Sequence, residues 1–145
     1  MPKKKSKDAA GGDKPTRTSG LLRHPDHKMF AVWVTKRDEI AIEKCNQRWH
    51  TTATNTLLLL AFQSFEYSCG DREFRRPIVS PSLRRTIDEY LETIRSDGAI
   101  GGSRTTFQLH ESYFPRIDAA KNYFDLTGRP EFVRLILRLA GDYKI

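Results

Sequence analysis

The sequence contains few cysteines and no long apolar run, and each shortage excludes a class of protein. Cys45 and Cys69 are too few for a disulfide framework, and their spacing fits no common zinc pattern. We therefore expect a reducing compartment, the cytoplasm. The apolar run at residues 57–62 is core-sized, whereas a membrane helix needs roughly 18 such residues. No apolar segment follows the basic start, so neither a secretory signal nor a membrane partner is expected.

Catalytic motifs are missing as well. The sequence has no glycine-rich phosphate loop, no His-Glu-x-x-His motif and no evident set of nucleophile, base and orienting residue. Cys45 falls on a predicted core stripe, where a thiol is usually inert. We expect a protein that is not an enzyme and that uses no metal and no cofactor.

The net charge of +7 is concentrated at one end of the chain. Residues 1–28 contain eight Lys or Arg and three Asp, which leaves only +2 for residues 29–145. A basic arm on a nearly neutral body is typical of proteins that bind a polyanion, most often nucleic acid. Its composition predicts disorder in the free protein, and a merely solubilising terminus is the alternative. The arm residues expected to contact DNA without sequence preference are Lys3, Lys4, Lys5 and Lys7.

A strand and two helices are predicted after the arm. Residues 29–35 are rich in β-branched and aromatic side chains, which favours a strand. Apolar residues between positions 41 and 49 recur at helical spacing, which predicts a first helix. After a polar break at residues 50–55, a stripe at residues 57–65 predicts a second helix with Thr54 as its N-cap.

The same pattern occurs again 75 residues later. One offset aligns the apolar positions of the strand and of both helices without a gap. A match over three elements is much less expected by chance than a match over one helix, so it indicates an internal repeat. The aligned pairs are Val32 with Phe107, Val34 with Leu109, Ile42 with Ile117, Cys45 with Ala120, Trp49 with Phe124, Leu57 with Phe132, Leu58 with Val133, Ala61 with Ile136, and Phe62 with Leu137.

The repeat predicts the fold. One strand with two helices cannot fold alone, because both edges of the strand would stay unpaired. Two copies can pair their strands antiparallel above four helices. The expected fold is α+β, mainly α: a single-chain tandem ribbon-helix-helix, a monomer with internal pseudo-two-fold symmetry. Its units are residues 29–68 and 104–145. They are joined by a connector, residues 69–103, whose extra helix at 82–96 either braces the pair or contacts a partner.

In a ribbon-helix-helix protein the ribbon enters the DNA major groove. Arg and Gln match guanine and adenine edges there, whereas Trp33 could stack, contact thymine methyl groups or simply pack. Phosphate contacts are expected after the first strand and where the second helices begin. Ordinary solvent-facing residues are the alternative reading of these positions. The base-reading candidates are Trp33, Thr35, Arg104, Thr106, Gln108 and His110. The phosphate-binding candidates are Lys36, Arg37, Thr52, Thr54, Asn55, Gly128 and Arg129.

Residues 117–128, Ile-Asp-Ala-Ala-Lys-Asn-Tyr-Phe-Asp-Leu-Thr-Gly, preceded by Thr-Phe-Gln-Leu at 106–109, resemble a known family. This family is that of the virulence-C operon accessory proteins of Agrobacterium-type tumour-inducing and root-inducing plasmids. The resemblance in sequence covers about a dozen residues; over the first copy only the predicted order of strand and helices is similar. The extra helix and the short arm depart from the family pattern. It implies a tandem ribbon-helix-helix that binds double-stranded DNA at an enhancer near the border or transfer origin. It also implies a relaxase and a ParA-like ATPase as partners in T-DNA or plasmid strand transfer.

Two other functions remain open at this point. The same ribbon would suit a transcriptional repressor or a plasmid partition protein. A helical scaffold that binds a protein partner is an alternative from another class.

Overall fold

A computed structural model describes residues 26–70, 77–97 and 102–145 of the chain. This part confirms the expected class: it is α+β and mostly helical, with five helices and one two-stranded antiparallel sheet. Within it, no helix combines the length and apolarity needed to cross a membrane. The elements in chain order are β1 (His27–Val34), α2 (Lys36–Trp49), α3 (Thr54–Ser68), α4 (Pro81–Asp97), β2 (Ser103–His110), α5 (Tyr113–Tyr123) and α6 (Arg129–Gly141).

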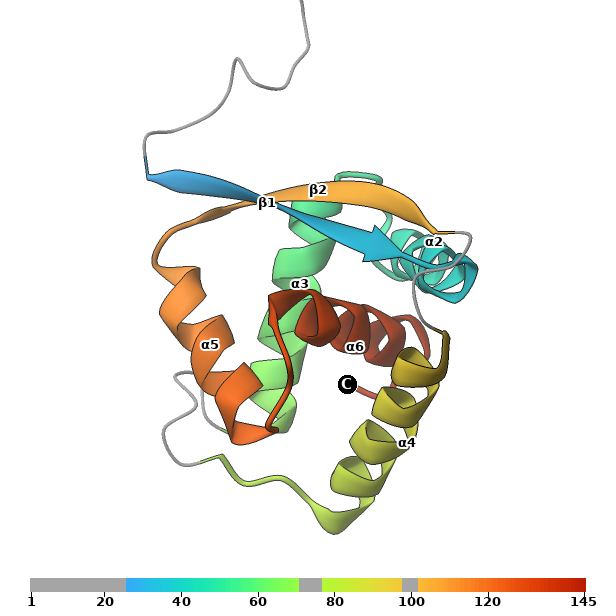
Figure 1. The fold of residues 1–145 in the computed structure, drawn as a ribbon, viewed down its shortest axis with the longest axis vertical. Helices are drawn as coiled ribbons and strands as arrows, with labels where there is room; N and C mark the ends of the chain where they lie inside the picture. Colours follow the sequence, from blue (N-terminus) through green and yellow to red (C-terminus); the bar gives the residue numbers. More distant parts are fainter. Residues whose placement is uncertain (1–25, 71–76, 98–101) are drawn as a thin grey trace, which may run out of the picture.

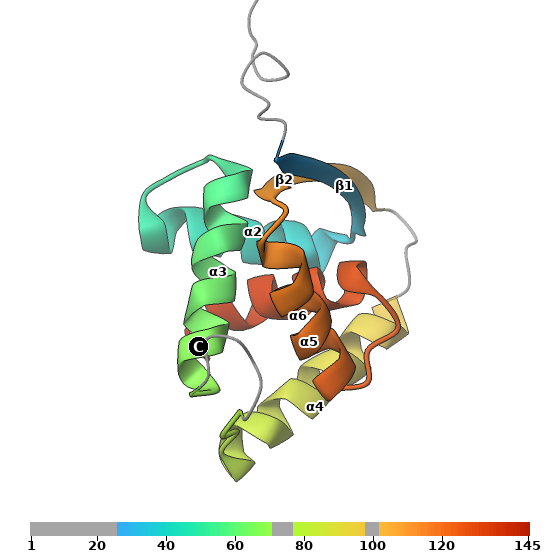
Figure 2. The ribbon, with the colours of Figure 1, turned by 90° about the vertical axis from the view of Figure 1, so that its left-hand side faces the viewer.

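The sheet lies across one end of the helical body (Figures 1 and 2). β1 and β2 pair over their whole length, and Ala31 faces Thr106 near the middle. Side chains alternate along each strand, as an extended backbone requires. Val32 of β1 and Phe107 of β2 are buried against the helices, and the ring of Phe107 lies 5.8 Å from that of Phe30. The opposite face is turned to solvent.

Local sequence determines where the helices begin and end. Thr35 forms a capping box with Asp38, in which the Thr35 backbone N–H donates to Asp38 Oδ2 at 2.7 Å. α2 ends at Trp49, and its C-cap, His50, has a left-handed φ of 54°. The prediction of Thr54 as the N-cap of α3 is wrong by one residue. Ala53 occupies that position and offers no side-chain acceptor, so Thr54 is already helical.

α6 is the central helix of the body. It packs against the four other helices and against β1. Phe132 of α6 meets the rings of Phe62 and Phe65 edge-on, at 5.9 and 5.3 Å. α4 lies below α6 (Figures 1 and 2), so this extra helix packs within the chain, as expected for a brace. Arg95 of α4 forms an ion pair with Glu131 of α6 at 2.9 Å.

The positions related by the 75-residue offset are core positions in the structure. Both members are buried in seven of the nine aligned pairs, so the offset follows the core rather than chance composition. The exceptions involve Ile42 and Trp49, which are partly buried and pack against the same core.

Candidate nucleic-acid interface

The solvent-facing side of the sheet, which we call the outer ribbon face, carries different chemistry on its two strands. Its facing pairs are Met29 with Gln108, Ala31 with Thr106, and Trp33 with Arg104. On β1 the large side chains are apolar and exposed, Met29 by 50% and Trp33 by 57%. On β2, Arg104 and Thr106 are exposed and Gln108 is half-buried.

Two polar side chains of β2, those of Arg104 and Gln108, have no partner in the part of the chain that the structure describes. Within residues 26–70, 77–97 and 102–145, Arg104 forms no ion pair and the Gln108 amide makes no hydrogen bond. The backbone of Gln108 is nevertheless fixed, because its N–H donates to Asn55 Oδ1 at 2.7 Å. The predicted base-reading residues Trp33, Arg104, Thr106 and Gln108 therefore share one accessible surface.

His110 stands at the end of this surface and is held by its neighbours. Its Nδ1 accepts the Ser112 backbone N–H at 3.1 Å, and its Nε2 lies 3.8 Å from Asp26 Oδ2. The rings of His110 and His27 meet edge-on across the two strands, with centroids 5.4 Å apart. His110 is thus less free than Arg104 to reach a base edge.

Thr35 does not lie on the outer ribbon face. β1 ends at Val34, so the alternation that would turn Thr35 outward stops one residue too early. Thr35 is buried at the start of α2, and its Oγ1 accepts a hydrogen bond from Arg138 Nη2 at 3.2 Å. A hydroxyl used in this way cannot read a base.

The N-terminus of α3 borders the outer ribbon face. Asn55 joins it to β2, and the first turn of α3 contains no acidic residue. Thr52 and Asn55 are exposed, and Thr54 is half-buried. A cleft of about 510 Å³ between α3 and the sheet is lined in part by Asn55, Thr56 and Gln108. Unpaired N–H groups and the helix dipole make such an end suitable for a phosphate.

The N-terminus of α6 has different surroundings. Arg129 holds Asp118 in a two-pronged ion pair, with N–O distances of 2.9 and 2.8 Å. Glu131 accepts the Thr127 backbone N–H at 3.1 Å, and a hydrogen bond from Arg95 keeps the pKa of Glu131 below its usual value. Gly128 is half-buried. The predicted phosphate contacts at Gly128 and Arg129 therefore compete with acidic groups of the chain itself.

Two predicted phosphate contacts follow β1 directly. Lys36 is 85% exposed with Glu39 at 3.9 Å, and Arg37 is 63% exposed with Asp97 at 3.4 Å. Both lie beside the Trp33–Arg104 end of the ribbon. The arm residues Lys3, Lys4, Lys5 and Lys7 lie outside the described residues.

Sequence reasoning missed Met29. We expected the strand to begin at this residue and assigned it to neither face, whereas β1 begins at His27. Extending the alternation of Ala31 and Trp33 by one step toward the N-terminus would have placed Met29 on the outer ribbon face. Lys28, which we assigned to the basic arm, is exposed and belongs to β1.

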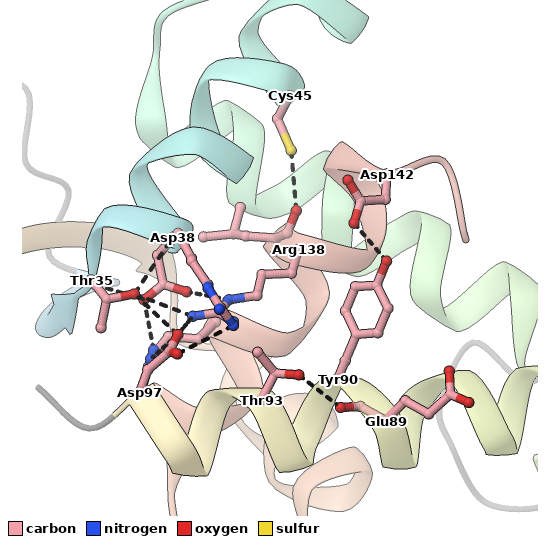
Figure 3. A network of polar contacts seen from close by, with 12 residues as sticks. Thr35, Asp38, Cys45, Glu89, Tyr90, Thr93, Asp97, Arg138 and Asp142 are labelled. Atoms are coloured by element: carbon pink, nitrogen blue, oxygen red, sulfur yellow. Dashed lines mark hydrogen bonds and ion pairs between the residues drawn. The ribbon is translucent and has the colours of Figure 1, made fainter.

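A buried ionic cluster supports the Trp33–Arg104 end of the ribbon (Figure 3). Asp38 is fully buried and accepts from Arg138 Nε at 2.6 Å and from Arg134 Nε at 2.7 Å. Arg138 also donates to Asp97 Oδ2 at 2.6 Å. Burial favours a raised pKa for Asp97, but the hydrogen bond and charge of Arg138 outweigh it and lower that pKa. The cluster joins the start of α2, the end of α4 and the middle of α6.

Both cysteines, Cys45 and Cys69, are buried as free thiols. The Cys45 thiol lies 3.5 Å from the Leu137 carbonyl oxygen (Figure 3), and burial raises its pKa to about 11. It is therefore protonated at neutral pH. No three His, Cys, Asp or Glu residues of the described ranges are placed to hold a metal ion.

No protein-family model, curated protein or solved structure matches this chain.

Proposed function

We propose that this chain is a double-stranded DNA-binding protein that places its ribbon in the major groove. The observation that carries the proposal is the outer ribbon face, where the side chains of Arg104 and Gln108 have no partner among the described residues and Trp33 is exposed. The major groove is about 12 Å wide and admits a two-stranded ribbon. Arg is suited to the guanine edge and Gln to the adenine edge, so the face supports a preference for sequence.

Its architecture, in our proposal, is a single-chain tandem ribbon-helix-helix that acts as a monomer and is not an enzyme. The strand register supports this. The offset of 75 carries Ala31 to Thr106, and Thr106 is also the residue that Ala31 faces. An axis through this pair would exchange β1 with β2 and the first copy with the second. One chain would then supply the ribbon that two chains usually share.

Phosphate contacts hold the ribbon in register on the duplex in this proposal. The N-terminus of α3 and Lys36 flank the outer ribbon face. The first turn of α3 contains no acidic residue, and Lys36 Nζ lies 3.9 Å from Glu39 Oε1. Contacts by the basic arm would add affinity for any sequence.

The biological role we propose is that of an accessory protein for plasmid or T-DNA strand transfer. It would act near a border or transfer origin, beside a relaxase and a ParA-like ATPase. The resemblance at residues 106–128 is its support. A repressor would instead prefer its own promoter, and a partition protein a centromere-like repeat.

The test begins with selection of preferred sites by the full-length protein from a random duplex library. Affinities for the selected site and for random DNA are then measured by fluorescence anisotropy at several salt concentrations. Arg104→Ala and Gln108→Ala should each weaken binding to the selected site by about 5-fold to 150-fold. Affinity for random DNA should change little.

Arg85→Ala is the matched control, because Arg85 is exposed at the far end of α4 from the sheet (Figure 1). Equal losses on selected and random DNA would contradict base reading by β2. Binding that does not weaken as salt rises would contradict a DNA-binding function altogether.

A further inference from the structure

The outer ribbon face is divided lengthwise into an apolar strand and a polar strand. Under the offset of 75, Met29 corresponds to Arg104 and Trp33 to Gln108. These outer positions exchange apolar for polar character, although seven of the nine aligned core pairs are buried and apolar in both copies. The two strands therefore present different chemistry to a common ligand.

Met29 and Gln108 are direct neighbours across this division. They face each other in the register, where opposite Cβ atoms lie about 4.5–5.5 Å apart. Met29 is half exposed and offers a flexible apolar surface. The Gln108 amide has no partner in the described ranges, while Asn55 anchors the backbone beneath it. A hydrogen-bonding group and an apolar group thus project side by side.

An A·T base pair presents the complementary arrangement in the major groove. Adenine offers its N7 acceptor and N6 donor, and thymine offers its methyl group on the other strand of the duplex. We infer that Met29 and Gln108 read one A·T pair together. The Gln108 amide donates to adenine N7 and accepts from N6, and the Met29 side chain packs on the thymine methyl group. This inference rests on the proposed function.

The Trp33–Arg104 end of the ribbon is suited to a different base pair. Arg104 matches the O6 and N7 acceptors of guanine, and the cytosine paired with that guanine has no methyl group. Trp33, which faces Arg104, therefore cannot repeat the contact made by Met29 within the same base pair. The A·T pair is assigned to the Met29 end, and this gives the chain one orientation on an asymmetric site.

A protein partner is the competing occupant of an exposed apolar surface. The surroundings favour DNA. Arg104, Thr106 and Gln108 run alongside the apolar residues, and α3 borders them with a first turn that lacks acids. This border attracts phosphate, which a duplex presents on both sides of its groove.

The experiment uses the full-length protein and the site selected from random DNA. Each A·T pair of the site is replaced in turn by A·U, which removes only the methyl group. Each is also replaced by 7-deazaadenine·T, which removes only the N7 acceptor. At one pair we expect the wild-type protein to lose affinity about threefold to fivefold on methyl removal, the worth of one buried methyl group. The same pair should be sensitive to loss of N7.

Three variants assign the contacts at that pair. Met29→Ala should bind the T and U duplexes equally and keep its sensitivity to 7-deazaadenine. Gln108→Ala should still bind the T duplex more tightly than the U duplex, but should lose its sensitivity to 7-deazaadenine. Met29→Leu keeps an apolar contact and should still prefer T. Tyr67→Ala is the matched control, because Tyr67 is 86% exposed near the end of α3 opposite its N-terminus, and it should keep both discriminations.

Two results would overturn the inference and leave the proposed function in place. One is duplex binding with no A·T pair that shows both sensitivities. The other is a T-over-U preference that Met29→Ala retains. The first is measured on the wild-type protein, so it does not depend on how a variant folds. Self-association of the wild type that Met29→Ala abolishes would assign the face to a second copy and also overturn the inference. Absence of any duplex binding would overturn the proposed function itself.

Discussion

The second helix of each copy, α3 and α6, occupies a matching place in the repeat but has different surroundings. Leu135 and Leu139 of α6 are fully buried because the body encloses this helix. The positions 75 residues earlier, Leu60 and Ser64 of α3, are half-buried. Arg138 of α6 lies inside the ionic cluster, and its counterpart Gln63 is exposed.

The same apolar pattern is therefore found in a helix that the body encloses, α6, and in a helix that is partly open to solvent, α3. Of the described helices, α4 packs against α6 and not against α3. α6 thereby becomes the centre of the core, and the acids and arginines around its start are paired with one another. α3 keeps one open side and an N-terminus that reaches the ribbon. Under the proposed function, α6 would serve mainly stability and α3 mainly phosphate binding.

The largest expected effect tests the stability half of this comparison. Asp38→Asn removes the buried carboxylate that Arg134 and Arg138 share, and leaves the guanidinium groups of both with Asp97 as their remaining acidic partner in the described part. Breaking such a buried pair costs about 3–5 kcal/mol. Urea denaturation should show this loss in the free energy of unfolding. Glu43→Gln, an exposed change on the same helix, should stay within about 0.5 kcal/mol. Equal effects would mean that the cluster does not stabilise the body.

A smaller loss is expected where α6 touches α2. A Cβ atom added at Gly141 would lie 2.8 Å from the Ala41 carbonyl oxygen, which is backbone and cannot easily move away. Gly141→Ala should therefore destabilise the protein by about 1–3 kcal/mol, the usual range for overpacking. Gly128→Ala is the control, because its added Cβ lies 3.5 Å from Pro130 Cδ and its φ of −172° suits any residue. Thermal unfolding of the two variants should separate them, and similar melting temperatures would contradict a close α2–α6 contact.

Acid should weaken the attachment of α4 to α6. Hydrogen bonds from Arg95 and Thr127 lower the pKa of Glu131. Burial alone would raise the pKa of Asp97, but the hydrogen bond from Arg138 and the charges of the nearby arginines lower it. A carboxylate whose pKa is lower in the folded state stabilises it fully above its unfolded pKa of about 4, and that stabilisation is lost as pH falls through the folded value. The free energy of unfolding should thus fall as pH drops below about 4. Asp97→Asn should make this dependence shallower, and an unchanged slope would exclude Asp97 as a source.

Sequence periodicity predicted the elements and most of the core because those features depend on local spacing. The repeat placed Val32, Phe107 and Ile136 in the core, and they are buried. The ionic cluster escaped prediction, since Asp38 and Arg138 are 100 residues apart and no local pattern joins them. Thr35 was misplaced because a capping box, not strand alternation, determines its position. The pairing of Arg129 with Asp118 likewise depends on how α5 and α6 meet, which spacing within either helix does not reveal.

The smallest expected effect tests the binding half of the comparison. Asn55→Asp adds a negative charge at the start of α3 and keeps an oxygen that can accept the Gln108 N–H. If this helix end contacts a phosphate, affinity for duplex DNA should fall about threefold to tenfold at low salt, and the difference should shrink as salt screens the charge. Asn122→Asp makes the same change at the end of α5 away from the sheet (Figure 1) and should have little effect. Equal losses in the two variants would show that only net charge matters, and α3 would then have no advantage over α6 as the phosphate-binding helix.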